Sequence, residues 1–105
     1  MNRAEPDALG ALSGDRTDLV VVGRKPVMRY ALAVITSFNR GSTEVVIRGR
    51  GRAVAKCVDV VNTLRRSFYR DLKIEDVRLG TDQLQLGDRT VNVSFIEIRI
   101  SRRSR

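Results

Sequence analysis

Two short basic stretches carry the residues best suited to chemistry in this chain. They are Gly23–Pro26, with the sequence GRKP, and Arg48–Arg52, with the sequence RGRGR. Arginine and lysine supply fixed positive charge and N–H donors, and the intervening glycines let the backbone approach a ligand closely. Neither stretch contains a carboxylate, so both favour the binding of a polyanion. The candidate binding residues are Arg24, Lys25, Arg48, Arg50 and Arg52.

Other chemistries find little support. The chain has no histidine, and it has no Gly-Lys-Ser or Gly-Lys-Thr phosphate loop. Gly49-Arg50-Gly51 begins like a dinucleotide fingerprint, but Val54 stands where the third glycine belongs. Cys57 lies on an apolar stripe without a neighbouring base, which is typical of a buried thiol. The carboxylates are scattered. We therefore predict that the protein is not an enzyme and needs no metal and no cofactor.

Length and charge narrow the possible partners. The 105 residues are 42% hydrophobic and predict one small domain, with a formal net charge of +8. Residues 1–18 hold two arginines and four acids, so the rest of the chain carries +10. Such an excess usually indicates nucleic acid, and less often an anionic membrane or an acidic protein. A basic surface that is merely solvated is the simplest alternative.

The flanking patterns show how the two stretches are positioned. The apolar and largely β-branched run Leu19–Val22 predicts an interior strand covered on both faces, and Val27–Arg40 predicts a broadly apolar helix. Glu44–Ile47 predicts a second strand, and a second helix follows Gly51. A strand–helix–strand unit makes a right-handed crossover between parallel strands, so both basic stretches should leave the sheet at the same edge.

The second helix has an apolar face and a polar face. Its polar face begins with Arg52 and Lys56, one turn apart, which extends the basic edge. Positive charge opposes the helix dipole there, so we interpret it as serving a ligand. The predicted apolar stripe consists of Val54, Cys57, Val58, Val61, Leu64 and Phe68.

After Asp71 the apolar residues recur at every second position, which predicts a long β-hairpin. The alternating apolar residues shift between even-numbered and odd-numbered positions near Glu75-Asp76 and again near Gly80-Thr81. A bulge is therefore expected at one of these places. Gly87-Asp88 is a turn signal, and Arg89 follows it at the hairpin tip. No helix is left to cover the far half of the hairpin. We expect residues 1–18 to form a flexible tail, residues 19–101 the domain, and residues 102–105 a basic tail.

Three stretches together resemble one known family. Gly23–Met28 (GRKPVM), Val45–Ala53 (VVIRGRGRA) and Val93–Ile98 (VSFIEI) are similar to signature stretches of Alba, the small basic chromatin proteins of archaea. The resemblance covers about residues 19–101. It implies an α/β (α+β) two-layer sandwich of β-α-β-α-β-β order, with a mixed four-stranded sheet, two helices and a long β3–β4 hairpin. That fold is similar to the C-terminal domain of translation initiation factor three.

The resemblance also implies a function. It implies a homodimeric architectural protein that condenses double-stranded DNA with little sequence specificity and that also binds RNA. Whether the dimers assemble further along the DNA is left open. Basic loops would lie on the phosphate backbone and hairpin arms in the minor groove. The main alternative is an RNA chaperone or ribonucleoprotein subunit, and a scaffold for acidic protein or lipid surfaces is another. The expected location is the cytoplasm, associated with the chromosome, and no apolar run is long enough to cross a membrane.

By the same resemblance, individual residues acquire roles. The family's nucleic-acid-binding positions fall on Arg24, Lys25, Arg48, Arg50, Arg52, Lys56 and Arg89. Its phenylalanine for contact between dimers falls on Phe68. The family's acetylated loop lysine is replaced by Arg24, which cannot be acetylated, so Lys25 is the remaining loop candidate for modification.

Overall fold

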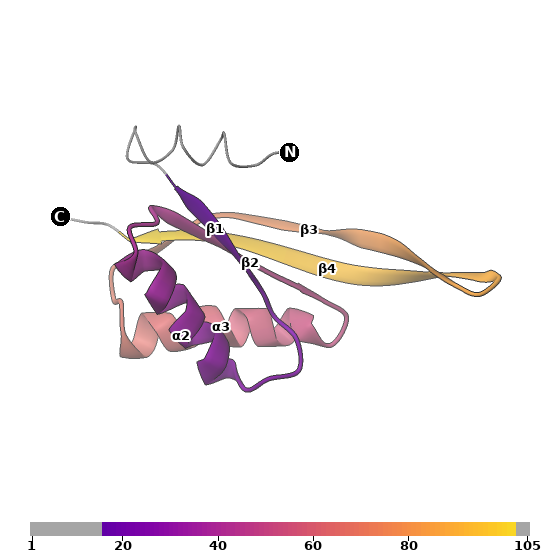
Figure 1. The fold of residues 1–105 in the computed structure, drawn as a ribbon, viewed down its shortest axis with the longest axis horizontal. Coiled ribbons are helices and arrows are strands. Elements are labelled where there is room, and N and C mark those ends of the chain that lie inside the picture. Colours follow the sequence, from indigo (N-terminus) through magenta and orange to yellow (C-terminus); the bar gives the residue numbers. More distant parts are fainter. Residues whose placement is uncertain (1–15, 103–105) are drawn as a thin grey trace.

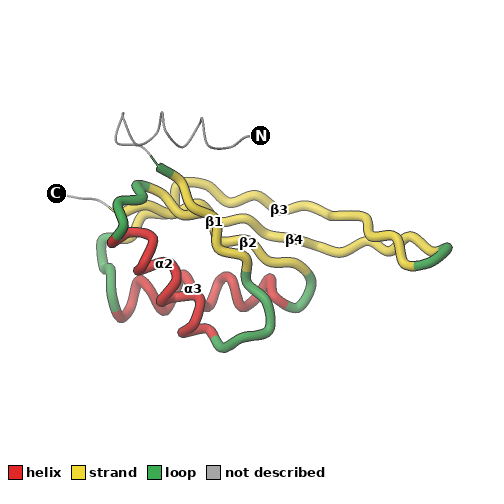
Figure 2. The backbone as a smooth tube through the Cα atoms, viewed as in Figure 1, coloured by secondary structure: helices red, strands yellow, loops and turns green. Residues whose placement is uncertain are grey.

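A mixed four-stranded sheet with both helices on one of its faces forms the protein (Figures 1 and 2). The computed structural model describes residues 16–102. The predicted β-α-β-α-β-β order is confirmed. The elements are β1 (Thr17–Val21), α2 (Val27–Asn39), β2 (Glu44–Arg50), α3 (Ala53–Ser67), β3 (Leu72–Leu86) and β4 (Arg89–Arg102). The predicted tails were residues 1–18 and 102–105, of which residues 1–15 and 103–105 lie outside the described residues. Thr17 and Asp18 belong to β1, and Arg102 belongs to β4.

The strand order is β1-β2-β4-β3. β1 and β2 are parallel, with Leu19 opposite Val46, and the other two pairings are antiparallel. The predicted parallel pair is therefore confirmed, and the chain leaves β1 and β2 at the same edge of the sheet. The backbone N–H of Val22 donates to the Arg48 carbonyl oxygen at 2.8 Å, which fixes the start of the first basic loop beside β2.

The hydrophobic core lies between the helices and one face of the sheet. Alternate residues of β2 and β4 point into it, as the two-residue period of a strand requires. The largest fully buried side chains are Ile47, Leu64, Ile100, Val34, Val45, Val60 and Cys57. The stripe predicted for α3 was partly wrong, because Val60 is buried while Val58 is 41% exposed. α3 packs against both the sheet and α2, so its buried arc is rotated toward Cys57 and Val60.

The prediction that the first strand is interior was wrong. β1 is an edge strand, and Leu19 and Val21 are 59% and 63% exposed, while Val20 and Val22 are buried. The helices cover only one face of the sheet, so alternate apolar residues of β1 remain on the open face. Continuous β-branched runs typically occupy strands covered on both faces, and this strand departs from that rule.

The hairpin of β3 and β4 extends beyond the helices as an arm (Figure 1). The register shifts between Ile74 and Asp76, which confirms a bulge at the first of the two predicted places. Gly87 has a φ of 64° in the tip, a conformation that favours glycine. Farther back, the Phe95 ring lies over Gly80, where an added Cβ would come within 2.7 Å of the ring.

Candidate functional site

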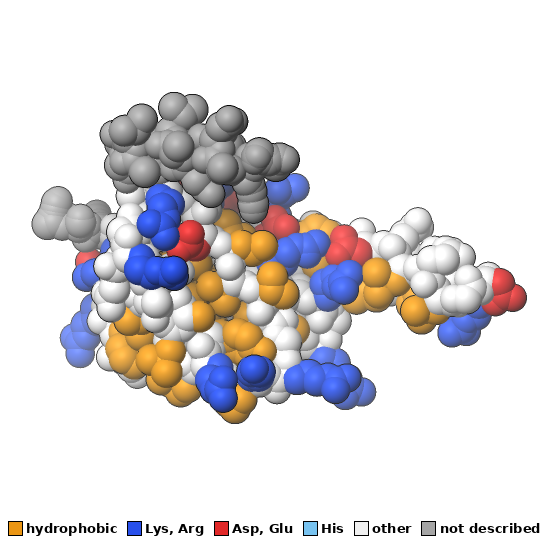
Figure 3. All heavy atoms as spheres, viewed as in Figure 1, with side chains coloured by type: hydrophobic (Ala, Val, Ile, Leu, Met, Phe, Trp, Pro, Cys, Tyr) orange, Lys and Arg blue, Asp and Glu red, His pale blue; other side chains and the backbone are white. Residues whose placement is uncertain are grey.

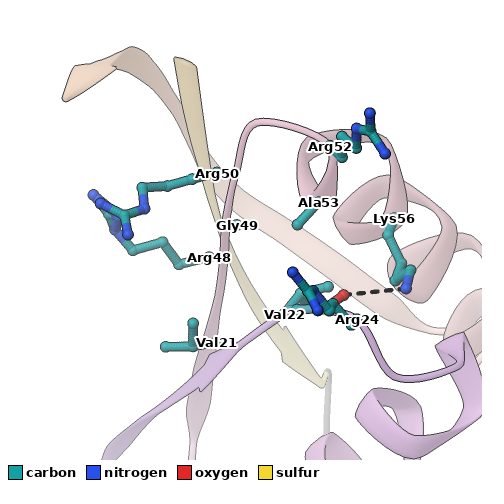
Figure 4. A pocket seen from close by; sticks show the side chains of 10 residues that line it. Val21, Val22, Arg24, Arg48, Gly49, Arg50, Arg52, Ala53 and Lys56 are labelled. Atoms are coloured by element: carbon teal, nitrogen blue, oxygen red, sulfur yellow. Dashed lines mark hydrogen bonds between the residues drawn. The ribbon is translucent and has the colours of Figure 1, made fainter. Parts of the chain in front are cut away.

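An open hollow of about 910 Å³ lies where the chain leaves β1 and β2 (Figure 4). It is bounded by the end of β1, the first basic loop, the end of β2 and the start of α3. Five of its ten lining residues are cationic and none is acidic. The lining residues are Val21, Val22, Gly23, Arg24, Arg48, Gly49, Arg50, Arg52, Ala53 and Lys56.

The first basic loop is held in place by two side chains. The Tyr30 hydroxyl oxygen accepts hydrogen bonds from the backbone N–H of Gly23 at 2.9 Å and of Lys25 at 3.0 Å. The Lys56 ammonium donates to the carbonyl oxygens of Gly23 at 3.1 Å and Lys25 at 2.7 Å (Figure 4 draws a bond from Lys56). We call Tyr30 and Lys56 the loop clamp. It connects the loop to α2 and α3 and fixes the backbone on both sides of Arg24.

The loop clamp changes the interpretation of Lys56. Two of the three donors of its ammonium are directed at backbone carbonyls, so Lys56 orders the loop as well as adding charge. Sequence reasoning missed Tyr30. The available signal was its place in the first turn of α2, because helical side chains lean toward the helix N-terminus and hence toward the preceding loop.

We expect Tyr30→Phe to weaken nucleic-acid binding by roughly five- to 150-fold, since it removes the acceptor of two hydrogen bonds worth about 0.5–1.5 kcal/mol each. No phosphate contact is lost, so the slope of log K against log salt should stay unchanged. Titrations with nucleic acid at several salt concentrations measure the affinity and the slope. Amide hydrogen exchange at Gly23 and Lys25 reports the loss of the two hydrogen bonds. A changed slope would mean that Tyr30 contacts the ligand directly.

The predicted single basic edge is divided by β2. Arg48, Gly49 and Arg50 were expected in a loop, but they continue β2 and pair with β4. The side chains of Arg48 and Arg50 therefore lie on the open face of the sheet, while Arg24, Arg52 and Lys56 lie on the other side of β2 (Figure 4). The glycines permitted both a loop and a strand, and the pairing with β4 determined which one formed.

Arg48 is bound by neighbours on the open face. Its guanidinium donates to Asp82 and Glu97, both at 3.0 Å, and lies 4.5 Å above the centre of the Phe95 ring. Arg50 lies farther from Asp82, at 3.7 Å, and its side chain is 49% exposed. These carboxylates come from β3 and β4, which the sequence did not place near the basic stretch. Arg48 therefore helps to order the sheet, whereas Arg50 keeps much of its surface available.

The start of α3 approaches β2 through Gly49. A Cβ on Gly49 would lie 2.5 Å from the Cys57 sulfur and 2.9 Å from the Ala53 carbonyl oxygen. The next glycine, Gly51, has a φ of 56° and turns the chain into the helix. Arg52 then occupies the N-cap position. Close packing of β2 on α3 thus places Arg52 at the rim of the hollow.

We expect Gly49→Ala to destabilise the protein by about 1–3 kcal/mol, because the added methyl group meets a backbone oxygen that cannot move away. Chemical denaturation measures this loss. Arg52 should also shift relative to Arg50, so that affinity for nucleic acid falls even under conditions where the variant is folded. Gly41→Ala provides a comparison, since nothing lies within 4 Å of that position, although its φ of 104° adds local strain. Equal stability of Gly49→Ala and the unaltered protein would contradict the expected clash.

The remaining predicted site residues lie apart from the hollow. Lys25 is exposed on the first loop but does not line the hollow. Arg89 begins β4 at the hairpin tip. Phe68 is the C-cap residue of α3 and is 45% exposed, so the prediction that it belongs to the core was wrong. Within residues 16–102, no ion pair involves Arg24, Lys25, Arg52 or Arg89.

Cys57 is fully buried, and burial raises the pKa of its thiol from 9.0 to about 11. A thiol of that kind is a poor nucleophile near neutral pH. Among residues 16–102 no group of three potential metal ligands comes together. None of the described helices has the length and apolar character needed to cross a membrane.

The fold and the hollow define a class: small basic α/β proteins with a cationic sheet edge suited to polyanions. The chain belongs to the Alba family, whose sequence profile matches residues 18–81. This confirms the resemblance seen in the three motifs. Members of this family are nucleic-acid-binding architectural proteins and not enzymes.

Several archaeal proteins are similar over most of their length. The DNA/RNA-binding protein Alba 1 of Archaeoglobus fulgidus is 46% identical over 80% of this chain and 94% of its own. The DNA/RNA-binding protein Alba of Methanothrix thermoacetophila is 47% identical over 77% of this chain and 91% of its own. The solved structure of Alba from Thermoplasma volcanium is 44% identical, with a TM-score of 0.76 over 80% of this chain and 99% of that one. The solved structure of ALBA1 from Trypanosoma brucei shares the fold. It is 21% identical, and the match covers 80% of this chain and 68% of that one with a TM-score of 0.66.

Proposed function

We propose that this protein binds nucleic acid as an architectural protein, and that its main ligand is double-stranded DNA bound with little sequence specificity. The observation that carries the proposal is the hollow at the sheet edge, where Arg24, Arg52 and Lys56 lie together on one side of β2 and no acidic residue belongs to the lining. Family membership and the names of the relatives, which are DNA/RNA-binding proteins, support the same conclusion.

The loop side chains supply contacts that do not depend on sequence. Arg24 and Arg52 present guanidinium groups whose planar N–H donors match phosphate oxygens. Phosphate contacts fix the register of a protein on a duplex and release counterions, whereas base contacts provide sequence specificity. Because the rim of the hollow consists of arginines on short segments, affinity should depend mainly on charge.

The hairpin arm supplies a second contact. It carries Arg89 at its tip and extends away from the body of the protein. A two-stranded ribbon with exposed polar side chains can follow a groove of the duplex, and we assign the arm to the minor groove. There the donor and acceptor pattern separates A·T from G·C pairs but little else, which agrees with weak sequence preference.

We also propose that the protein is a homodimer. Ile74, Val77 and Leu79 of β3 lie on the same face as the core, opposite the buried isoleucines of β4, but are 37%, 47% and 73% exposed. α3 packs on β2 and β4, so this part of β3 is left uncovered. A continuous apolar strip of this kind is typical of an interface between subunits, and a second copy of the chain is the partner we assign to it. In the cell we expect the dimer in the cytoplasm, bound to the chromosome.

Equilibrium binding to random-sequence duplex DNA tests the proposal. We expect binding with similar affinity for unrelated sequences, and competition at equal salt should show preference for the duplex over a structured RNA. A clear preference for structured RNA would instead favour an RNA chaperone or ribonucleoprotein subunit. Absence of binding to both nucleic acids, with retention on acidic vesicles, would contradict the proposal and favour the scaffold alternative.

A further inference from the structure

Two arginines share one carboxylate where the hairpin arm leaves the body of the protein. The Oδ2 atom of Asp82 accepts a hydrogen bond from Nη2 of Arg48 at 3.0 Å, and Nη1 of Arg50 lies 3.7 Å from the same oxygen. Figure 4 shows the two guanidinium groups next to each other on the open face of the sheet. An anionic oxygen of the protein itself therefore contacts two of the arginines that line the hollow.

Asp82 belongs to the root of the arm. β2 ends at Arg50, which lies opposite Phe95 of β4, whereas Asp82 of β3 lies opposite Val93, past the end of β2. β4 separates β2 from β3, so the arginine side chains extend across β4 to reach this carboxylate. A nucleic acid bound to both the hollow and the arm, as the proposed function states, runs close to Asp82.

Arg48 and Arg50 are held to different degrees. Arg48 also donates to Glu97 at 3.0 Å and stacks 4.5 Å above the centre of the Phe95 ring, and its side chain is only 25% exposed. The Arg50 side chain is 49% exposed, and within residues 16–102 Asp82 is the only carboxylate with which it pairs. At 3.7 Å this ion pair is too long for a hydrogen bond. Arg50 can therefore change its partner, while Arg48 keeps Glu97 and Phe95.

A purely structural role explains only part of this arrangement. The hydrogen bond between Arg48 and Asp82 is sufficient to connect β2 to the arm. Arg50 adds a long and exposed contact, and exposed ion pairs contribute little to stability. Asp82 also places a negative charge beside a hollow that has no acidic residue in its lining. That charge lowers the positive potential that attracts phosphate groups, so it opposes the ligand that the hollow favours.

We infer that Asp82 competes with phosphate for Arg50 and thereby sets the affinity of the protein for nucleic acid. In the free protein the carboxylate holds Arg50, and in the complex the Arg50 guanidinium turns to a phosphate oxygen. Asp82 then keeps its hydrogen bond with Arg48. Binding breaks one ion pair and brings a phosphate near a carboxylate, and both effects lower the affinity. The inference rests on the proposed function, because it requires a phosphate contact at Arg50.

Neutralising the carboxylate with little change of shape tests the inference. In the full-length protein, Asp82→Asn should strengthen binding to random-sequence duplex DNA by roughly three- to 25-fold. This range corresponds to one exposed ion pair that no longer has to be broken in each protomer of the proposed homodimer. Fluorescence anisotropy measures the affinity, and circular dichroism checks that the variant is folded.

Asp76→Asn is the matched control for the loss of a negative charge. Asp76 lies on the same strand and the same face as Asp82, and it forms a comparable ion pair with Arg99 at 3.9 Å. The two carboxylates are six residues apart, which corresponds to roughly 20 Å along β3. Because the screening length is about 8 Å at physiological ionic strength, Asp76→Asn should change the affinity by less than about twofold.

A double-mutant cycle with Arg50 identifies the contact responsible. In an Arg50→Ala background, Asp82→Asn should raise the affinity no more than Asp76→Asn does, because no guanidinium is left to compete for. An equal gain in both backgrounds would overturn the inference, since it would be a general effect of charge. Weaker binding by Asp82→Asn would also overturn it, because Asp82 would then act mainly by ordering the arm. If the unaltered protein fails to bind the duplex, the proposed function itself fails.

Discussion

Raising the salt concentration from about 50 to about 200 mM should weaken binding to random-sequence duplex DNA by roughly 10³–10⁵-fold. This range follows if a dimer contacts about six to ten phosphates, because each contact releases condensed counterions. Arg24, Arg50 and Arg52 at the hollow, with Lys25 and Arg89 outside it, provide enough cations per protomer. Fluorescence anisotropy at several salt concentrations gives the slope. A salt-insensitive affinity would contradict binding through phosphates.

The double variant Arg24→Ala/Arg52→Ala should show which cations release the counterions. It removes four phosphate contacts from a homodimer, so the slope of log K against log salt should decrease in magnitude by about four. Affinity should fall for all sequences alike. Arg29→Ala/Arg40→Ala is the matched control and should leave the slope nearly unchanged. Loss of affinity for only some sequences would mean that these arginines contact bases, and an unchanged slope would remove them from the interface.

Leu79→Asp should convert the proposed homodimer into a monomer. The substitution places a carboxylate in the exposed apolar strip of β3, and an uncompensated charge buried at an interface costs about 3–5 kcal/mol. The dimer dissociation constant should therefore rise by more than roughly 10²-fold. Because Leu79 is 73% exposed in the protomer, the fold itself should tolerate the change. Analytical ultracentrifugation measures the association state, and circular dichroism reports the fold.

Leu19→Asp is the matched control for this second prediction. Leu19 is 59% exposed on the open face of β1, on the other side of the sheet and at its other edge. That variant should remain dimeric. If Leu79→Asp also remains dimeric, the strip on β3 is not the interface. If both variants dissociate, the interface must include the open face.

The identity of the cationic residues was predictable, but their neighbours were not. The sequence placed Arg24 and Arg52 at the same sheet edge because parallel strands end together, and the hollow contains both. It did not predict that Arg48 would bind Asp82 and Glu97, which are 34 and 49 residues away in the chain. Contacts of such separation depend on the register of β2, β3 and β4. No local pattern encodes that register in a chain whose alternating apolar residues shift between odd and even positions three times within the two hairpin strands.

The burial of apolar residues was also only partly predictable from the sequence. The helices and strands followed from periodicity, yet β1 proved to be an edge strand and Val58 proved to be exposed. Periodicity identifies an apolar face but does not say what covers it. Helices on one face of the sheet leave Leu19 and Val21 uncovered, and that arrangement follows from the packing of α2 and α3 on the sheet.

By itself, the sequence determined the order of the elements, the parallel pairing of the first two strands, the long hairpin and the cationic character of the sheet edge. These properties depend on residue type and short-range spacing, which the local sequence specifies without any tertiary contact. Only the tertiary structure decided that Arg48 is paired with Asp82 and Glu97, and that Tyr30 and Lys56 clamp the first loop. Those properties depend on distances between segments far apart in the chain, and such distances exist only once the sheet and helices have packed together.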